Sequence, residues 1–358
     1  MRLHVVALPH TLLTRAYEWC AYTAKIRRFA NMLTSKGWPV TVYGPETTEL
    51  SSAVETVTIV TERDRKQWFG SSEWQHTQSF GYWKNTDRCW TVMNDRAAQA
   101  IRDRWQPGDE LCLIAGNCQE SIATDLSVMP VEWGIGYTGV LHQSHKVFES
   151  YAWMHHVSGL MKKDELQPHD AVIPNCYDLE DFTPSDTHGN YLLYMGRAIE
   201  RKGLAVVRDL AETAGVPVYV AGQTDPQIPN ARYVGLVTGR AKAELLAGAY
   251  AVLTPTTYLE PFGGVAVEAM LSGTPVIASD WGAFTETVQD GLTGFRCRTP
   301  EQYRAAVERV RDLDRSAISW QAETRYSTTV GAERYNAYFA QLGLVPARQV
   351  TSMAGARG

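Results

Sequence analysis

The stretch at residues 249–278 constrains the fold more than any other, because it reads as strand, loop, helix and strand in turn. Its centre, residues 254–273, has the sequence TPTTYLEPFGGVAVEAMLSG. Gly263 and Gly264 stand where the loop turns into a helix that begins near Val265, so bare backbone N–H groups face outward at the positive end of that helix. Such a helix start binds anions, phosphate in particular. The stretch therefore predicts an anion site between a strand and a helix.

Two glutamates flank this anion site. Glu260 lies on the loop, and Glu268 lies about two turns down the helix, on the side of the site. A carboxylate beside a phosphate is electrostatically unfavourable unless it has another task, and accepting hydrogen bonds from hydroxyl groups is the obvious one. The predicted ligand is therefore an anion that also carries a polyol, such as a nucleotide sugar.

Length and composition indicate a soluble enzyme of two domains. A chain of 358 residues is too long for one ordinary core. Its net charge of −5 argues against a surface that grips nucleic acid as a whole, although a local basic patch stays open. The six cysteines form no C-x-x-C pair and are expected to be reduced thiols. No run reaches the roughly 18 apolar residues of a membrane helix, so we expect a cytoplasmic protein without a membrane span.

The first half of the chain opens with a β-α-β pattern. We expect a strand at 3–8, a helix at 17–35 and a second strand at 40–43, and such an opening requires a parallel sheet. The loop after the first strand then lies at the carboxyl edge of the sheet, where open α/β folds bind ligands. His10 and Thr11 in that loop are thus candidate substrate contacts.

Five tryptophans fall within residues 62–106, at positions 68, 74, 83, 90 and 105. Large aromatic side chains are mostly buried packing groups, which favours a helical insertion whose tryptophans form core. The alternative is a platform for the acceptor, because sugars and bases also stack on aromatic rings. The sequence leaves both interpretations open.

The pattern of strands and helices restarts after a connector. The connector, residues 171–186, contains a short strand, Pro174 and an acidic stretch that ends at Pro184. Before it we expect a strand at 111–115, a strand or strand-like loop at 133–141 and helical spacing at 146–160. Strands and helices that alternate again after it predict a second doubly wound domain. The expected organisation is a Rossmann-like domain at 1–170, a linker at 171–186, a Rossmann-like domain at 187–326, a helix at 327–345 that is a candidate to cross back to the first domain, and a flexible tail at 346–358.

Four pieces of the second half carry a specific resemblance. They are VIPNCYDLEDF at 172–182, YLLYMGRAIERKG at 191–203, EPFGGVAVEAM at 260–270 and GTPVIASDWGAFTETVQDGLTGF at 273–295. In this order they resemble the retaining glycosyltransferases of family 4. That family has the α/β fold called GT-B, in which two Rossmann-like doubly wound domains face a central cleft. In the first half, HTLLTRAYEWCAYTAKIRRF and VFESYAWMHHVSG look like phrases in phage-associated members.

The resemblance implies how a donor is held. Members of the family break a sugar–diphosphate bond, and the leaving nucleotide gains negative charge as that bond lengthens, so a positive group must meet it. Arg197 and Lys202, in GRAIERKG, match the family positions that grip the diphosphate, whereas Arg201 between them is expected to be a surface residue. Glu260 opens the E-x7-E element and matches the contact to the donor sugar, and Glu268 matches the contact to the ribose hydroxyls.

Further positions match family contacts that the backbone makes. The loop of Gly235 and Val237 corresponds to the one that receives the nucleobase, although packing in an apolar core is nearly as good an interpretation of Val237. The candidate substrate contacts of the second domain are Gly196, Gly235, Val237, Pro261, Phe262, Gly263, Gly264, Val265 and Glu268.

The first domain is expected to bring the acceptor and a histidine near the C6 hydroxyl of the donor sugar. His142 in YTGVLHQSHKVF is the best candidate, and His10, His145, His155 and His156 compete with it. A single histidine is more often structural or solvated than functional. Retention without a nucleophile is explained in this family by same-face displacement, in which the departing phosphate oxygen takes the acceptor's proton. The catalytic candidates are therefore Arg197, Lys202, Glu260 and His142.

Neither a metal nor a cofactor is implied. The one Asp-x-Asp of the sequence, Asp312 to Asp314, falls in a charged helical pattern after the motifs. Arg197 and Lys202 can neutralise the diphosphate themselves. The expected donor is a nucleotide-diphosphate sugar carrying a glucose-like hexose, and UDP is the commonest nucleotide in the resembling family.

Three alternatives remain for the reaction and its acceptor. A nucleotide-sugar 2-epimerase would use two similar domains without an acceptor, although such enzymes lack the usual form of EPFGG. A transferase of this family could also act on a glycan or a lipid. The phage-like phrases suggest a hydroxylated base in DNA, for which phosphate contacts would come from Lys25, Arg27, Arg28 and Lys36. A solvated helix face explains these four residues at least as well.

Overall fold

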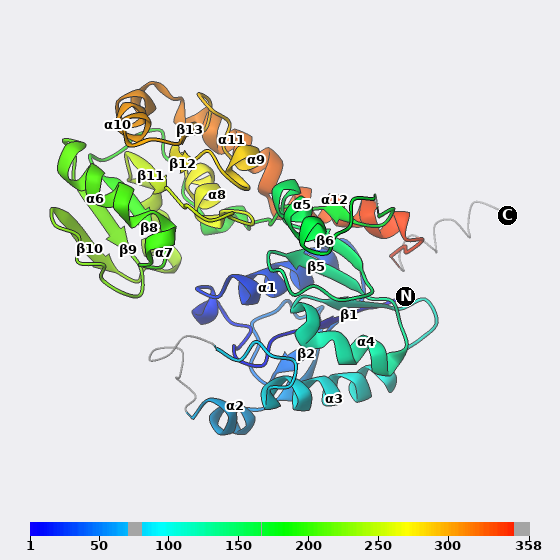
Figure 1. Ribbon diagram of the computed structural model, residues 1–358. Helices are drawn as coiled ribbons and strands as arrows, with labels where there is room; N and C mark the ends of the chain where they lie inside the picture. Colours follow the sequence, from blue (N-terminus) through cyan, green and yellow to red (C-terminus); the bar gives the residue numbers. More distant parts are fainter. Residues whose placement is uncertain (71–80, 166, 347–358) are drawn as a thin grey trace. The chain divides into compact units, whose positions relative to one another are not determined.

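The computed structural model describes residues 1–70, 81–165 and 167–346, and the chain forms two compact units (Figure 1). Unit 1 comprises Met1–Phe148, Asp164–Ile173 and the chain from Gly331 onward, and unit 2 comprises Glu149–Lys163 and Pro174–Val330. The expected domains place 149–163 with the first half, whereas the structure packs this segment in unit 2. Of the expected tail at 346–358, all but Pro346 lies outside the described residues.

Unit 1 is built on a seven-stranded sheet in the order β3-β2-β1-β4-β5-β6-β7. Neighbouring strands pair in parallel throughout. The strands are β1 (Leu3–Val6), β2 (Val40–Pro45), β3 (Glu55–Val60), β4 (Glu110–Leu113), β5 (Val131–Ile135), β6 (His145–Phe148) and β7 (Ala171–Val172). Most residues of the central strands are buried, as expected of a parallel sheet covered on both faces.

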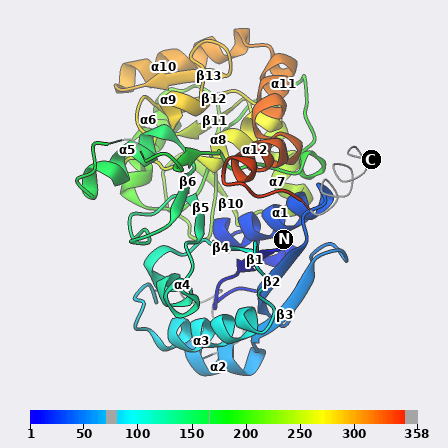
Figure 2. The same ribbon diagram turned by 90° about the vertical axis from the view of Figure 1, so that its right-hand side faces the viewer.

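Helices cover both faces of this sheet. They are α1 (Ala21–Ser35), α2 (Glu62–Phe69), α3 (Arg88–Arg102), α4 (Glu120–Leu126) and the part of α12 (Thr328–Gln341) that belongs to unit 1. On one face α3 and α4 lie side by side (Figure 2) and bury Met93, Ile101 and Ile122 against the strands. On the other, Phe29 of α1 stacks on Trp133 of β5 at 3.9 Å between ring centroids.

Where it is described, the tryptophan-rich segment forms α2 and α3 with loops around them, and Trp83 and Trp105 lie outside the helices. Trp90 of α3 is fully buried, and its indole N–H donates to the carbonyl of Tyr82 at 2.7 Å. Trp68 and Trp105 are half-buried, whereas Trp83 keeps 46% of its surface exposed. Trp74 lies outside the described residues. Packing therefore accounts for Trp90, and among the described tryptophans of this segment the platform interpretation stays open for the exposed Trp83.

The expected helical spacing at 146–160 is wrong for its first residues. Residues 146–148 end β6, where they pair with β5 and β7 and are buried, and the helix α5 (Tyr151–Leu160) begins after Ser150. The hydroxyl of Ser150 accepts a hydrogen bond from the N–H of Trp153 at 3.1 Å, which is an N-cap. Of the strand or strand-like loop expected at 133–141, residues 133–135 belong to the strand β5, which ends at Ile135.

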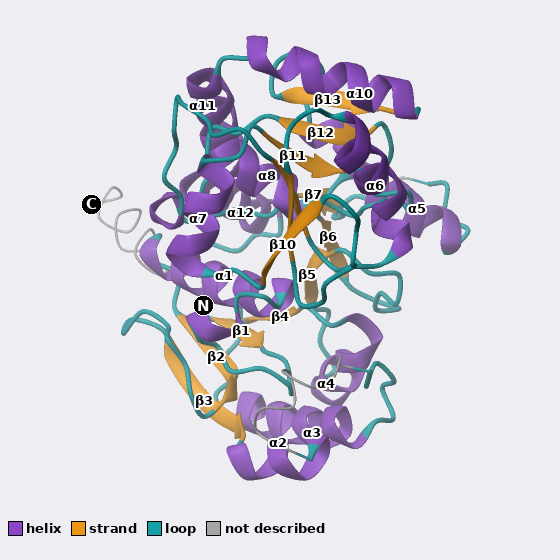
Figure 3. Ribbon diagram, turned by 90° about the vertical axis from the view of Figure 1, so that its left-hand side faces the viewer, coloured by secondary structure: helices purple, strands orange, loops and turns teal. Residues whose placement is uncertain are grey.

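Unit 2 is built on a six-stranded parallel sheet in the order β10-β9-β8-β11-β12-β13, of which Figure 3 shows β11, β12 and β13 side by side. Its strands are β8 (Leu192–Met195), β9 (Val218–Ala221), β10 (Ala231–Gly235), β11 (Ala251–Thr254), β12 (Val276–Ser279) and β13 (Gly294–Cys297). Its helices are α5, α6 (Leu204–Thr213), α7 (Gly239–Ala247), α8 (Gly264–Leu271), α9 (Phe284–Thr287), α10 (Pro300–Arg309) and α11 (Arg315–Tyr326).

Alternate residues of the strands in unit 2 pack into two separate hydrophobic cores, one on each face of the sheet. Ala251 and Leu253 of β11 join the core beneath α6 and α10, whereas Val252 joins the core beneath α7, α8 and α11. Because successive side chains of a strand point to opposite faces, a short apolar run supplies both layers. The predicted α/β class with two Rossmann-like domains is thereby confirmed.

A buried arginine at the start of α11 forms hydrogen bonds to residues next to the sheet of unit 2. The Arg315 guanidinium, on a residue only 6% exposed, donates to the carbonyls of Ser185, Ala249 and Ala247 and to the hydroxyl of Thr274, at 2.6 to 3.1 Å. Its burial lowers its pKa to about 10. The preceding Asp314 caps α11 by accepting from the N–H groups of residues 316 and 317, which is a structural role for the second aspartate of the Asp-x-Asp.

We expect the substitution Arg315→Lys to lower the stability of the protein by about 2–4 kcal/mol. The ammonium group of lysine cannot donate in all the directions of the planar guanidinium, so buried carbonyls are left without donors. Urea denaturation measures the change. Arg311→Lys is the control, since Arg311 is exposed and pairs with Glu308 on the surface. Equal stability of the two variants would contradict this role.

Candidate functional site

The sheet of unit 2 changes direction between two strands. From β8 the chain adds β9 and β10 on one side and then returns to place β11 on the other side of β8. Ligands of open parallel sheets bind outside the carboxyl ends of the strands at such a switch point. GRAIERKG follows β8 and EPFGG follows β11, so both predicted donor motifs leave the sheet there.

Backbone contacts hold these two loops against each other. A Cβ atom at Gly203 would lie 2.0 Å from the carbonyl oxygen of Pro255, and the φ of +85° at Gly203 is in the left-handed region that favours glycine. The N–H of Thr257 donates to the carbonyl of Arg201 at 2.9 Å. Both the turn and the close approach therefore require glycine at position 203.

An ion pair joins the side chains of the two loops. Lys202 Nζ lies 2.6 Å from Glu260 Oε2, and the two side chains are 21% and 12% exposed. The pair places an ammonium suited to phosphate and a carboxylate suited to hydroxyl groups in direct contact. The structure thus brings together two of the predicted catalytic candidates.

Tyr258 lies against the same pair and was missed by sequence reasoning. The centroid of its ring is 4.1 Å from Arg201 Cζ and 4.9 Å from Lys202 Nζ, which are cation–π distances. Burial raises the pKa of Tyr258, and the Glu260 carboxylate adds to the rise. A single aromatic residue two positions before Glu260 carries no pattern that would have revealed this contact.

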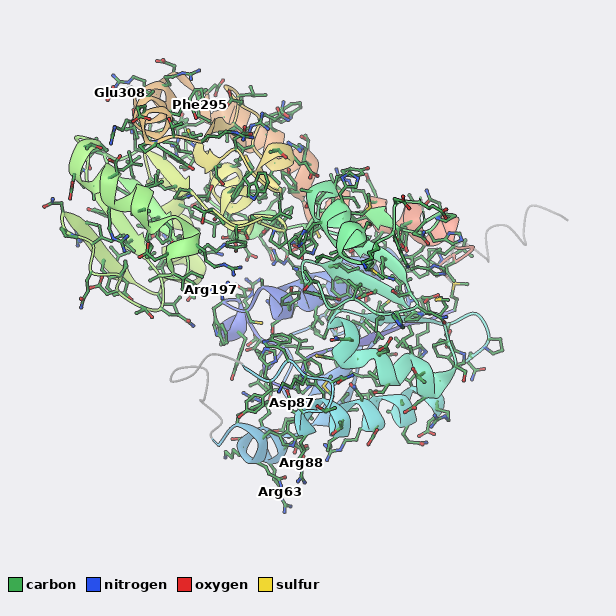
Figure 4. The ribbon with its side chains drawn as sticks, viewed as in Figure 1. Arg63, Asp87, Arg88, Arg197, Phe295 and Glu308 are labelled. Carbon is green, nitrogen blue, oxygen red and sulfur yellow. The ribbon has the colours of Figure 1, made fainter. Side chains whose placement is uncertain are left out.

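The backbone at the end of β8 is fixed while the side chain of Arg197 is exposed (Figure 4). The hydroxyl of Tyr194 donates to the carbonyl of Arg197 at 2.8 Å, and the N–H of Gly196 donates to the carbonyl of Ala221 at 3.0 Å. An exposed guanidinium on a fixed backbone suits an anion that arrives from solvent.

The start of α8 is shaped by glycines. Gly263 has a φ of +80°, and a Cβ atom there would lie 2.4 Å from the ring of Phe284. The N-cap residue Gly263 has no side chain with which to cap this helix, so the first N–H groups suit a ligand. Phe262 is buried and packs edge-on against Tyr326; only its backbone can serve a ligand. Pro261, Gly264 and Val265 are half-buried.

A second lysine–glutamate pair lies further down α8. Lys242 Nζ of α7 is 2.9 Å from Glu268 Oε1, and the two side chains are 24% and 17% exposed. Sequence reasoning missed Lys242, because its partner is on another helix. Gly235 ends β10 with a φ of +82° and open space where a Cβ atom would lie. Val237 is half-buried against the core of unit 2, which supports the packing interpretation of this residue.

The unit 1 candidates after β1 are buried. His10 is 2% exposed, and its burial lowers its pKa to about 3, so it is a neutral ring near Trp83 at 5.9 Å. The hydroxyl of Thr11 lies 2.6 Å from that of Thr23. The substrate roles of His10 and Thr11 stay predictions.

Two of the four cations assigned to DNA phosphates do not lie on a solvated face. Lys25 and Arg27 of α1 are each 8% exposed. Lys25 Nζ donates to the carbonyl of Gly134 at 3.3 Å, and Arg27 pairs with Glu18 at 2.8 Å. Burial lowers the pKa of Lys25 to about 7. The expectation of a basic helix face is corrected accordingly, because these side chains pack inward.

A buried carboxylate organises the loop that carries His142. Glu132 of β5 is fully buried and accepts hydrogen bonds from the hydroxyls of Tyr137 and Ser144 and from the N–H of Leu141, at 2.9 to 3.1 Å. His142 itself is exposed, and its N–H donates to Glu120 at 3.1 Å. The loop is therefore fixed from within unit 1, and the histidine projects from it.

Comparison with known proteins identifies one domain. Residues 178–325 match the family described as glycosyl transferases group 1. The match lies in the second half of the chain and includes both GRAIERKG and EPFGG. The phosphatidyl-myo-inositol mannosyltransferase of Mycobacterium tuberculosis H37Rv is 32% identical over 183 residues, which are 44% of this chain and 47% of that protein. The protein of the same name from Mycolicibacterium smegmatis is 30% identical over 241 residues, 55% of this chain and 61% of that protein.

Solved structures share the fold of the whole chain. AviGT4, a glycosyltransferase involved in avilamycin A biosynthesis, superposes with a TM-score of 0.69 at 18% identity, covering 96% of this chain and 98% of that one. HepE of Anabaena, in complex with UDP and glucose, has a TM-score of 0.64 at 14% identity, covering 95% and 100%.

The family match and the mannosyltransferase relatives support the predicted enzyme class, a transferase. The chain spans about half the length of the mannosyltransferases that it matches, from 47% to 61%. The resemblance of the first half to phage-associated members stays a prediction. Within residues 1–70, 81–165 and 167–346, no helix has both the length and the apolar character needed to cross a membrane.

The buried Glu132 makes the stability of unit 1 depend on pH. Burial raises its pKa from 4.5 to about 7, and the nearby Lys146 only partly opposes the rise. A carboxyl whose folded pKa is raised contributes stability that is fully present below its unfolded pKa and is lost as pH rises through the folded pKa. We therefore expect the stability of the wild type relative to Glu132→Gln to fall by about 2–3 kcal/mol between about pH 4.5 and 7.

Denaturation with urea at several pH values measures this difference. Glu333→Gln is the matched control, because Glu333 is exposed on α12. A difference curve for Glu132→Gln as flat as that of the control would show that the carboxyl titrates normally.

Proposed function

We propose that this protein is a retaining hexosyltransferase. It transfers a glucose-like hexose from a nucleotide diphosphate, UDP by preference, to a hydroxyl group of an acceptor, and it needs no metal. The observation that carries the proposal is the contact between Lys202 and Glu260 at the switch point between β8 and β11. The UDP in the complexes of HepE supports the choice of nucleotide.

The proposed reaction needs charge and position rather than a base. The bond from the sugar's anomeric carbon to the diphosphate oxygen breaks, and the acceptor oxygen bonds to that carbon on the same face. The departing phosphate oxygen takes the acceptor's proton. Arg197 and Lys202 stabilise the charge that develops on the diphosphate, and the N–H groups of Gly264 and Val265 at the start of α8 add to it.

The carboxylates hold the donor on either side of the diphosphate. Glu260 accepts hydrogen bonds from the sugar hydroxyls, and Glu268 accepts them from the ribose. Each carboxylate is paired with a lysine in the structure. The donor's hydroxyls therefore donate to carboxylate oxygens that are already oriented. This lowers the entropic cost of ordering the side chains on binding. His142 is the proposed contact near the C6 hydroxyl.

The acceptor is proposed only as a hydroxyl compound. The relatives' names include inositol-containing acceptors, as in the D-inositol 3-phosphate glycosyltransferase of Nocardioides, 38% identical over 96 residues. A glycan or lipid hydroxyl therefore fits the relatives better than a hydroxylated base in DNA. The burial of Lys25 and Arg27 removes part of the support for DNA.

A screen of nucleotide sugars that detects release of nucleoside diphosphate tests the function. We expect slow hydrolysis of one donor with retained anomeric configuration, faster release with a polyol or lipid acceptor, and no change when EDTA is added. Hydroxymethylated DNA is included as an acceptor. An epimerised sugar nucleotide without release of free sugar would identify the 2-epimerase alternative and overturn the transferase.

Arg197→Ala is expected to lower donor turnover by roughly 100- to 1,000-fold, since it removes a charge that stabilises the leaving group. The release assay measures the loss. Arg240→Ala serves as the control, because Arg240 is exposed and paired with Glu244 on the surface of α7. If Arg197→Ala turned over the donor at a rate near that of the control, Arg197 would have no part in the mechanism.

A further inference from the structure

A segment far away in the sequence anchors the loop that carries Glu260. The hydroxyl of Ser150, at the start of α5, donates to the carbonyl of Pro261 at 2.7 Å. Ser150 is only 2% exposed, and the same hydroxyl accepts from the N–H of Trp153. Both residues of this contact belong to unit 2, although β6 of unit 1 ends just before Glu149. The N-cap of α5 is thus also an anchor for the loop.

Glu286 of α9 fixes the start of α5. Its two carboxylate oxygens accept from the N–H groups of Tyr151 and Ala152 at 2.9 and 2.7 Å. Together with the Ser150 cap, this gives the first three N–H groups of α5 a hydrogen-bond acceptor each. A carboxylate at a helix N-terminus also interacts favourably with the helix dipole. Glu286 therefore determines where the Ser150 hydroxyl lies.

The turn before α9 holds the residue next to Pro261. The N–H of Ala283 donates to the carbonyl of Glu260 at 3.0 Å. A Cβ atom at Gly282 would lie 2.7 Å from the nitrogen of Glu260, so this turn packs directly on the glutamate's backbone. Two consecutive carbonyls, those of Glu260 and Pro261, are thereby held by two neighbouring elements that Glu286 links.

We infer that Ser150 and Glu286 are positioning residues, which set the Glu260 carboxylate against the donor sugar. The inference rests on the proposed function. The loop needs such anchors because Pro261 has no N–H to fix it and Gly263 and Gly264 follow it. Loss of the Ser150 hydroxyl leaves the Pro261 carbonyl without its donor, and a shift of the loop moves Glu260 away from Lys202.

The anchors act on the sugar half of the site, next to Glu260, whereas the start of α8, which is proposed to face the diphosphate, has a separate support in the packing of Gly263 on Phe284. Arg197 and Lys202 belong to the loop after β8, whose backbone hydrogen bonds within the described part of the chain run to Tyr194, Ala221 and Thr257 and not to α5 or α9. Variants of the anchors should therefore separate sugar recognition from nucleotide recognition. A general loss of folding would weaken both.

The test compares Ser150→Ala with Ser150→Thr, which keeps a hydroxyl, and with Ser158→Ala as the control on the same helix. We expect Ser150→Ala to lower kcat/KM for the donor by about 10- to 100-fold. Its affinity for the nucleoside diphosphate alone, measured by calorimetry, stays within twofold of the wild type. Ser150→Thr retains most activity, and Glu286→Gln shows a smaller loss of the same kind.

Hydrogen exchange gives a readout that does not depend on activity. Amide protection at Ala283, whose N–H donates to the carbonyl of Glu260, is expected to fall in Ser150→Ala and not in Ser158→Ala. Unchanged protection would overturn the inference about Ser150. Absence of turnover with every tested donor would contradict the proposed function but not, by itself, this inference. A parallel loss of diphosphate and donor affinity would also overturn it. If Ser150→Ala fails to fold, Glu286→Gln is judged by the same measurements.

Discussion

The close approach of Gly203 to the carbonyl of Pro255 is the constraint on which the candidate donor site depends. At 2.0 Å from that oxygen there is no room for a Cβ atom, so the two loops meet backbone to backbone. This contact places Lys202 next to Glu260. In the same way, a Cβ atom at Gly263 would clash with the ring of Phe284, and one at Gly282 would clash with the backbone of Glu260. The site is therefore positioned by tight packing of glycines, and its charged groups are added to a backbone that is already fixed.

Charge balance explains how such a site can persist without a ligand. A partly buried lysine or glutamate alone would carry a desolvation cost, and each pair offsets it for both members. Lys202 with Glu260 and Lys242 with Glu268 form two such pairs. The proposed donor offers a substitute for each partner, since its diphosphate can pair with lysine and its hydroxyls can bind carboxylate. Exchange of one partner for another keeps every charged group satisfied.

The sequence predicted the parts of the site that depend on local pattern. The strands before GRAIERKG and EPFGG, the glycine-led start of α8 and the two glutamates all follow from residues close together in the chain. It could not predict the partners that come from elsewhere: Tyr258, Lys242 and Glu286 carry no local signature. It also misplaced the basic face of α1, because a charge pattern does not reveal that Lys25 and Arg27 lie along the packed side. The roles of residues in the first half were predicted least well, because they too depend on packing between segments far apart in the sequence.

The boundary between β6 and α5 shows why one residue can have two roles. An N-cap requires only an acceptor for a helix N–H, and Ser, Thr, Asp and Asn all supply one. A hydroxyl also carries a proton that the cap does not use. In Ser150 that proton goes to Pro261, 111 residues further along the chain. Because the cap pattern describes the acceptor alone, the sequence indicates where a helix begins but not which distant carbonyl its hydroxyl holds, and the link from α5 to Glu260 is visible only in the fold.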